Sequence, residues 1–415
     1  MRIKDKLASG IGSVLEWYDF AIYGFYAPLI AQLYFPNEHQ SISLLKMFSV
    51  FAVGFIARPF GAIIFGMISD KYGRTATLKI TPILITIPSL IFGILPGYQQ
   101  IGILAPCILI VLRILQGICI GGEYSNNIIY LCETAEPRHA YFLGSLGSCT
   151  GSFGIFLAST MAAISYLIFP SNILNSWGWR ISFIMTLFFG IITFFMRKNM
   201  VESVVFQHIK NNNLLSNNPF KESIQKQYKD YLIAIGLCFL PSTAFYYIFV
   251  FMPTILTSLQ HYSSSIIFGD NSITLFLRLL MIPLLGMIAD KIGGIKIARI
   301  SCLLFILLSY PLFYFILNNK NHIELYVFSF AILTTLNAAT TPGLLMEFIK
   351  PQTRSTIISF AFNFSFGVFG GIVPVISLLL DNHFENNISS IYYLIFAALI
   401  TFISTYYFRK AAIYD

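Results

Sequence analysis

Charged side chains stand inside apolar stretches of this sequence. Glu16 and Asp19 are three residues apart, which places both on one face of a helix. Arg58 and Arg113 occur in two later apolar stretches. If these stretches cross a membrane, a charge at its middle costs roughly 2.5–3.5 kcal/mol on insertion scales and needs a partner or a task. A carboxylate in such a position can bind and release a proton, and a guanidinium can recognise an anionic group.

Asp19 and Glu16 are the carboxylates that we expect to bind a coupled proton, with Glu123 as a third candidate. At 1.5 Å per residue, Asp19 lies roughly 15 Å from a helix start near Gly10, and Arg113 lies at a similar depth in its own stretch. Burial disfavours a charged carboxylate, whereas a nearby arginine favours it. A carboxylate that leaves Arg113 at one point in a cycle would therefore load and unload a proton. The alternative is a static ion pair that only orients helices.

Arginine and aromatic side chains indicate how a small solute would be held. Forked guanidinium donors suit a carboxylate, which favours Arg113; for Arg58 and Arg278, packing is the competing explanation. Aromatic rings can hold a quaternary ammonium, but among 41 Phe and 23 Tyr most rings simply pack. Polar amides in apolar stretches either bind solute or bond across helices. The predicted solute-binding set is Arg113, Arg58, Tyr23, Gln116, Tyr246, Tyr247, Asn337 and Asn363. Further aromatic candidates are Trp17, Tyr18 and Tyr26.

The composition identifies the solvent that surrounds these residues. Of 415 residues, 56% are hydrophobic and 11% charged, against roughly 45–50% and 25% in soluble proteins. The mean hydropathy is +0.74, so most of the chain must face lipid. The six cysteines form no CxxC pair, and neither HExxH nor a phosphate-binding G-x4-G-K-[ST] motif occurs. We therefore expect no metal, no cofactor and no enzyme activity.

Twelve stretches are long and apolar enough to cross about 30 Å of hydrocarbon as helices. The predicted spans are 11–34, 47–69, 78–96, 102–132, 140–169, 179–197, 231–259, 266–289, 297–317, 323–348, 355–380 and 389–408. The eighth is the weakest, because Asp270, Asn271 and Arg278 interrupt it. The chain is thus expected to be an all-α membrane protein.

Lysine and arginine give the expected orientation. With the N-terminus inside, 20 of the 26 fall in cytoplasmic segments and three, Lys46, Arg180 and Lys320, fall outside. Positive charge marks the cytoplasmic side, so both termini are predicted to be cytoplasmic. The net charge of +8 is explained by this orientation and not by nucleic-acid binding. The polar, basic N-terminus lacks a signal-peptide pattern, so the first span should be retained.

An internal repeat divides the chain. Residues 66–73 read GMISDKYG and residues 286–293 read GMIADKIG, which match at six of eight positions. The same offset of 220 residues carries Arg58 onto Arg278. Because both motifs fall on one side of the membrane, the repeats are parallel, as in two-bundle transporters. We predict six-helix bundles at 1–197 and 231–415, joined by a cytoplasmic linker at 198–230.

Four segments carry a family resemblance: RPFGAIIFGMISDKYGRTATLK at 58–79, EWYDF at 16–20, RILQGICIGGE at 113–123 and WGWR at 177–180. They resemble the major facilitator superfamily, in particular its metabolite:proton symporters such as proline/betaine, ketoglutarate, citrate and shikimate carriers. The resemblance implies that Asp70 faces the start of the eleventh span and that Arg74 pairs with Glu133. The gating set that it implies is Gly66, Asp70, Arg74, Glu133 and Asp290.

The expected function is secondary active transport. We predict proton-coupled uptake of a small carboxylate-bearing or zwitterionic metabolite by alternating access. An exporter or antiporter of a metabolite or siderophore on the same fold is the alternative, although the span at 140–169 lacks the Gly-Pro signature of drug/proton antiporters. The expected partners are a small solute, protons and the lipid bilayer. The expected location is a bacterial inner membrane, and a monomer should suffice.

Overall fold

The described part of the chain is helical. The computed structural model describes residues 3–36, 40–253, 256, 264–318, 323–384 and 388–410, and no strand occurs among them. Ten helical segments of these residues are long and apolar enough to cross a membrane. Helices satisfy every backbone group within one segment, which lipid requires. Two further helices pack beside them. One is α1, which holds the charged residues Glu16 and Asp19, and the other is α18, which is apolar but shorter.

The elements follow one another in two runs that are joined by α10. The first run comprises α1 (Ile3–Phe25), α2 (Ala27–Tyr34), α3 (Gln40–Tyr72), α4 (Arg74–Ile94), α5 (Tyr98–Ile101), α6 (Leu104–Glu133), η1 (Pro137–His139), α7 (Ala140–Ile168), α8 (Ser171–Ile173), η2 (Leu174–Gly178) and α9 (Trp179–Arg197). After α10 (Val204–Asn211), the second run comprises α11 (Pro219–Tyr246), η3 (Tyr247–Phe251), α13 (Ser264–Ile292), α14 (Gly294–Asn318), α15 (Ile323–Phe348), α16 (Arg354–Phe364), η4 (Ser365–Gly370), α17 (Val373–His383) and α18 (Ile391–Tyr406).

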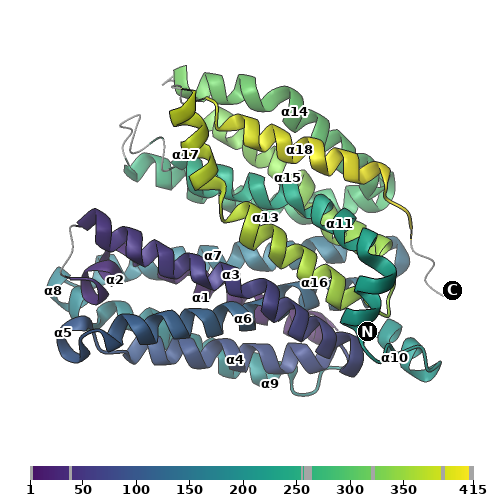
Figure 1. Cartoon of the computed structure of the whole chain (residues 1–415), viewed down its shortest axis with the longest axis horizontal. Coiled ribbons are helices and arrows are strands. Elements are labelled where there is room, and N and C mark those ends of the chain that lie inside the picture. The colour runs from purple at the N-terminus through teal and green to yellow at the C-terminus, as the bar shows by residue number, and fades with distance from the viewer. Residues whose placement is uncertain are drawn as a thin grey trace.

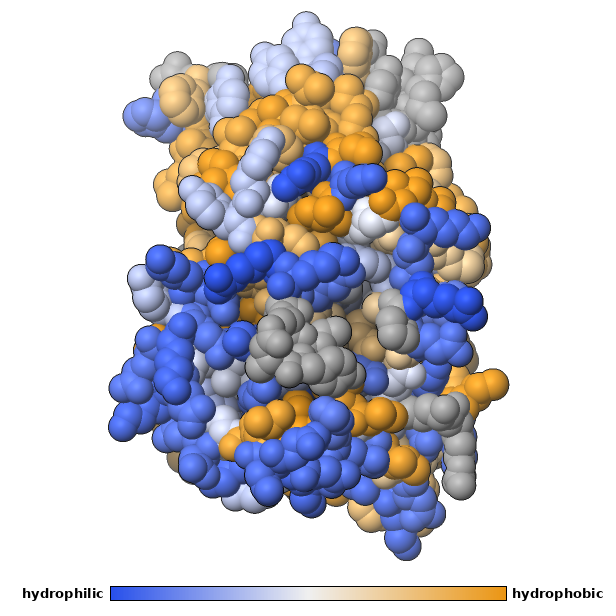
Figure 2. All heavy atoms as spheres, turned by 90° about the vertical axis from the view of Figure 1, so that its right-hand side faces the viewer, coloured by the Kyte–Doolittle hydropathy of each residue, from blue (hydrophilic) through white to orange (hydrophobic). Residues whose placement is uncertain are grey.

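The two runs gather in space as two helix groups (Figure 1). In the first, α3 packs on α6, α1 on α7 and α4 on α9. In the second, α14 packs on α15 and α18, and α11 packs on α16 and α18. The element α10 and both chain ends lie at one end of the molecule, which we call the linker end. Figure 2 looks onto this end, where hydrophilic side chains cover most of the lower half and form a band across the middle.

Contacts between the groups run along α3–α16, α7–α13 and α7–α15. Two glycines at corresponding positions of the repeat permit the closest approach. A Cβ on Gly66 would collide with the backbone of Thr356, and a Cβ on Gly286 would collide with Ser145. Small residues of this kind let helices in lipid pack backbone to backbone.

The predicted linker contains helical structure. The segment 198–230 contains α10, and α11 already begins at Pro219, where the Asn218 side chain accepts a hydrogen bond from the Lys221 amide at 3.1 Å. Non-helical dihedral angles at Gln227 (φ −133°, ψ 26°) then bend α11 before it enters the second group. The prediction missed these turns because their charged residues resemble a loop. The ends of the predicted spans 231–259 and 266–289, and Lys320, lie partly or wholly outside the described residues.

Candidate functional site

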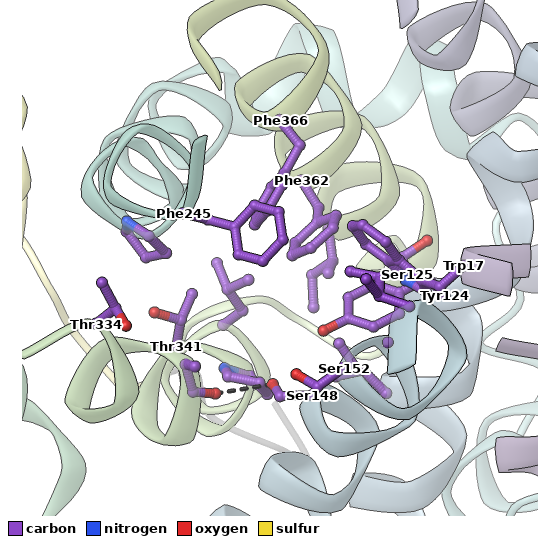
Figure 3. A pocket seen from close by; sticks show the side chains of 18 of the residues that line it. Trp17, Tyr124, Ser125, Ser148, Ser152, Phe245, Thr334, Thr341, Phe362 and Phe366 are labelled. Atoms are coloured by element: carbon purple, nitrogen blue, oxygen red, sulfur yellow. Dashed lines mark hydrogen bonds between the residues drawn. The ribbon is translucent and has the colours of Figure 1, made fainter. Parts of the chain in front are cut away.

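A cavity lies between the two helix groups, and residues of both line it (Figure 3). Its volume is about 50 Å³, measured as the space open to the centre of a water-sized sphere. At 10–15 Å³ per water, this is room for roughly three to five water-sized groups. The lining residues come from α1, α6 and α7 on one side and from α11, α13, α15, α16 and η4 on the other. A small solute at this position would contact both groups at once.

Aromatic rings form one wall of the cavity. Trp17 stands edge-on to Tyr124 and Phe245, with ring centroids 5.6 and 6.1 Å apart. Tyr124 lies 4.8 Å from Phe362, which stacks on Phe366 at 4.2 Å. Figure 3 shows these rings from both groups facing a common space. Such a wall offers π faces to a cation and apolar surface to methyl groups.

Hydroxyl groups and a guanidinium also line the cavity, and the guanidinium carbon of Arg278 lies 5.6 Å from the centroid of the Phe245 ring. Ser148 donates to the Ala338 carbonyl at 2.8 Å, and Arg278 Nη1 donates to the Ser152 hydroxyl at 2.9 Å. Arg278 is 8% exposed. Within the described part of the chain it forms no ion pair, and its buried Nε has no hydrogen-bond partner. The cavity therefore contains a buried cation without a protein anion.

Asp19 and Arg113 are brought together, with Gln116 between them. Arg113 Nη1 donates to Gln116 Oε1 at 3.0 Å, and Gln116 Nε2 donates to Asp19 Oδ2 at 2.9 Å and to Ser89 Oγ at 2.8 Å. The Arg113 guanidinium carbon also lies 3.4 Å from the centre of the Tyr23 ring. All of these side chains are buried inside the first helix group. None of them lines the cavity.

Glu16 and Arg58 form a second buried cluster. Arg58 Nη2 lies 3.2 Å from Glu16 Oε1, and the guanidinium carbon lies 5.7 Å from the centre of the Trp17 ring. The second Glu16 oxygen is buried and has no hydrogen bond to any described residue. Because Trp17 also lines the cavity, one aromatic ring separates this ion pair from the solute space.

Glu123 lies in a different environment. Its two oxygens accept from Arg197 Nη2 at 2.6 Å and Nη1 at 2.9 Å, and it also bonds Thr81. Arg197 donates further to the carbonyls of Ala8, Ser9 and Leu78. The pair therefore ties together α1, α4, α6 and α9. This arrangement favours a structural role, and sequence reasoning had counted Arg197 only as a positive-inside charge.

The remaining predicted solute-binding residues also lie away from the cavity. Tyr247 shares a hydrogen bond of 2.9 Å with Ser390, and the Tyr246 ring packs 5.7 Å from Phe55. Asn337 donates to Ser301 at 2.7 Å, and Asn363 donates across the groups to the Gly121 carbonyl at 2.9 Å. Of the aromatic candidates from the sequence, Trp17 alone is among the lining residues of this cavity.

Asp70 joins the two helix groups at the linker end. Its carboxylate accepts from the backbone amides of Ser355 at 3.0 Å and Thr356 at 2.8 Å, and from the Thr356 hydroxyl at 2.8 Å. Asp290, its counterpart in the repeat, accepts from the amides of Tyr141 at 2.9 Å and Phe142 at 3.0 Å. Each carboxylate thus caps the start of a helix in the opposite group, where free amides and the helix dipole favour an anion.

A buried charge network supports these contacts. Arg74 donates to Glu133 at 2.9 and 3.0 Å, to Asp70 at 2.9 Å and to the Pro351 carbonyl at 3.0 Å. Arg354, from the second group, pairs with the same glutamate at 3.1 Å. The contacts of Asp70 and Arg74 are those implied by the resemblance. Sequence reasoning missed Arg354, because a basic residue just after a predicted span is normally taken as a marker of the cytoplasmic side.

Comparison with known proteins now adds to this geometry. A family profile described as "Sugar (and other) transporter" matches residues 7–231. A protein named putative proline/betaine transporter from Staphylococcus haemolyticus is 32% identical over 410 residues, which cover 96% of this chain and 86% of the relative. The chain belongs to the major facilitator superfamily. The proline/betaine transporter of Escherichia coli K12 is 30% identical over 429 residues and covers 98% of this chain and 83% of the relative.

Solved structures of the superfamily share the fold. The proton:xylose symporter XylE bound to 6-bromo-6-deoxy-D-glucose superposes with a TM-score of 0.79 at 15% identity, covering 97% of this chain and 94% of XylE. XylE from E. coli in an inward-open conformation superposes with a TM-score of 0.66 at 16% identity, covering 98% and 96%. This major facilitator protein is therefore a multi-pass membrane transporter and not an enzyme.

Proposed function

We propose that this major facilitator protein is a proton-coupled symporter that takes up a small carboxylate-bearing or zwitterionic solute by alternating access. The observation that carries the proposal is the cavity between the two helix groups. Its wall contains the Arg278 guanidinium, which has no acidic partner among the described residues, and the buried carboxylates of Glu16 and Asp19 lie one and two residues from the lining residue Trp17 on α1. Relatives named proline/betaine transporters support a zwitterionic solute.

The architecture of the proposal follows the sequence prediction. Twelve spans, the ten long apolar segments with α1 and α18, form bundles at 1–197 and 231–415, joined by the linker 198–230. The linker end and both chain ends are cytoplasmic in a bacterial inner membrane, and the monomer is the working unit. The bundles rock about the cavity as rigid bodies.

The gating set biases the carrier toward the state in which the linker end is closed. In this proposal, Asp70 and Asp290 each hold a helix start of the opposite group, while Arg74 and Glu133 hold Asp70 in place. Opening toward the cytoplasm requires both caps to break. Gly66 lets the closed helices approach closely enough for these bonds to form.

Proton coupling is assigned to Asp19 and Glu16. Asp19 is bonded to a neutral amide and Glu16 to a single nitrogen of Arg58, and each has a second oxygen without a hydrogen bond among the described residues. A proton on either carboxylate therefore has a free site. Glu123, whose oxygens are both taken by Arg197, is left out of the coupling step.

The test uses proteoliposomes with an alkaline interior. Wild-type protein should accumulate radiolabelled proline or glycine betaine when the pH gradient is imposed, and a reversed preference for efflux would favour the exporter alternative. Asp19→Asn and Glu16→Gln should lose at least roughly tenfold of gradient-driven uptake but retain solute exchange without a gradient. Glu136→Gln, at an exposed pair with Arg138, is the matched control. Unaltered driven uptake in both variants and in their double mutant would rule out this coupling.

A further inference from the structure

The repeat places two arginines at corresponding positions but gives them different surroundings. Arg58 has Glu16 as its anion. At the same offset of 220 residues, Glu16 corresponds to Gly236 in α11, so the acid is absent from the second half. A Cβ on Gly236 would already collide with Ser404, which leaves no room for a carboxylate there. Arg278 consequently faces the cavity without an internal counterion.

The other buried arginines in the described ranges are occupied. Arg74 and Arg354 share Glu133, and Arg197 holds Glu123. Arg113 contacts Gln116 and Tyr23. Arg278 donates to the neutral Ser152 hydroxyl and lies 5.6 Å from the ring centroids of Phe245 and Phe249, and its buried Nε has no described hydrogen-bond partner. Unlike the other four, it lines the cavity between the helix groups. A buried charge without a counterion is costly. We therefore expect an anion from outside the protein to bind at Arg278.

We infer that Arg278 binds the solute's carboxylate while the aromatic rings of Trp17, Tyr124, Phe362 and Phe366 hold an alkylated ammonium group. This inference rests on the proposed function and assigns the two ends of its solute. Arg278 lies over the ring of Phe245, 5.6 Å from its centroid, so that ring belongs to the carboxylate end. Figure 3 shows Ser148 and Ser152 across the cavity from Phe362 and Phe366. A molecule with an anion at one end and a methylated cation at the other matches both ends.

The cavity also selects by polarity. The ammonium wall contains ring faces, and its nearest hydroxyls are already bonded, since Ser125 pairs with Ser359 at 2.7 Å. An ammonium that keeps its N–H donors would leave them unpaired against this wall, whereas methyl groups need no acceptor. The geometry thus favours N-methylated zwitterions over primary amino acids.

Three probes of one shape separate the two ends. Glycine betaine carries both charges, choline carries the trimethylammonium without the carboxylate, and 3,3-dimethylbutanoate carries the carboxylate without the positive charge. Binding to the purified full chain is measured by isothermal titration calorimetry at a single pH. For wild-type protein, choline should bind roughly 10- to 100-fold more weakly than glycine betaine, because a charge-assisted hydrogen-bond pair is lost. 3,3-Dimethylbutanoate should bind roughly 3- to 30-fold more weakly, because the cation–π contact is lost.

Variants then test which residue binds the carboxylate and which binds the ammonium of the solute. Arg278→Gln should weaken glycine betaine roughly 10- to 100-fold and leave choline unchanged or tighter, which also shows that the variant is folded. Arg278→Lys keeps the charge but loses the forked pair of N–H donors. Its affinity for glycine betaine should therefore lie between those of the wild type and Arg278→Gln. Trp17→Leu should weaken glycine betaine and choline but spare 3,3-dimethylbutanoate. Arg299→Gln on α14, whose guanidinium bonds Thr405, and Phe188→Leu, on an exposed face, are the matched controls.

The outcomes separate this inference from the proposed function. An Arg278→Gln variant that binds glycine betaine within threefold of wild type would overturn the inference, as would wild-type protein that does not distinguish the three probes. Gradient-driven uptake in proteoliposomes would still support the symporter in that case. Conversely, the expected binding pattern without gradient-driven uptake would retain the site and refute proton coupling.

Discussion

Glu123 and Arg197 illustrate why a buried acid is not always a proton carrier. Both carboxylate oxygens are bonded to one guanidinium, which also holds three backbone carbonyls. Removing one partner of such a pair leaves an uncompensated buried charge. Glu123→Gln should therefore lower the free energy of unfolding by about 3–5 kcal/mol.

Thermal unfolding of the purified protein checks this prediction. Asp19→Asn, whose native partner is a neutral amide, should unfold much closer to the wild-type temperature. A Glu123→Gln protein that is as stable as wild type, yet no longer accumulates solute, would return Glu123 to the coupling residues.

At the level of single residues, the sequence predicts some contacts and misses others for physical reasons. Asp19 and Arg113 were expected near each other because helix rise gives their depths, and Arg74 and Glu133 because a motif links them. The cavity serines and Arg278 were not favoured, because serines in apolar helices usually bond their own backbone. A count of charged residues cannot show which arginine has no acidic partner in the folded protein.

Among the elements, α4 depends on a residue of the linker. Glu202 accepts from the Arg74 and Thr75 amides at 3.1 Å each, and from the Thr75 hydroxyl at 2.6 Å, so it caps the start of α4 from outside the helix. The next residue, Ser203, donates to Glu133 at 2.6 Å. The linker thereby supports the same charge network that closes the gate.

Loss of this external cap should fray α4. We expect Glu202→Ala to cost about 1 kcal/mol and to reduce hydrogen-exchange protection of the amides at 74–78. The rest of the first helix group should keep its protection. Glu222→Ala, in the first turn of α11, should leave α4 unchanged. Equal loss of protection across all helices would contradict a local capping role.

The long apolar elements were largely predictable, since ten of the predicted stretches match the ten long segments to within a few residues at most ends. The turn of π-helix at η4 and the bend at Gln227 were not predictable. Gln227 accepts a hydrogen bond from the Thr353 hydroxyl at 2.9 Å and η4 packs on α11, and hydropathy does not record such contacts.

For the whole molecule, Asp70 and Asp290 make corresponding contacts between the two helix groups, and in the proposed cycle both contacts close the linker end. Asp70→Asn weakens an anionic cap and an ion pair with Arg74, so it should shift the population toward the state open at the linker end by about 1–2 kcal/mol. Asp290→Asn should act in the same direction and add to it.

Cys132, which is buried near this closure, is a native reporter. In a variant whose other cysteines are replaced by alanine, Asp70→Asn should increase its labelling by an impermeant maleimide applied from the linker side. Lys71→Gln, at the exposed neighbouring residue, is the control. Unchanged labelling in the double Asp70→Asn, Asp290→Asn variant would mean that other contacts hold the closure.

The unmatched guanidinium of Arg278 has an electrical consequence. A zwitterion brings one positive and one negative charge, so the empty carrier and the filled carrier hold the same net positive charge in the cavity. When the bundles rock, a charge that shifts through part of the membrane field feels the same part of about 2.3 kcal/mol per 100 mV. Binding of a zwitterion should therefore leave the voltage dependence of this movement in place.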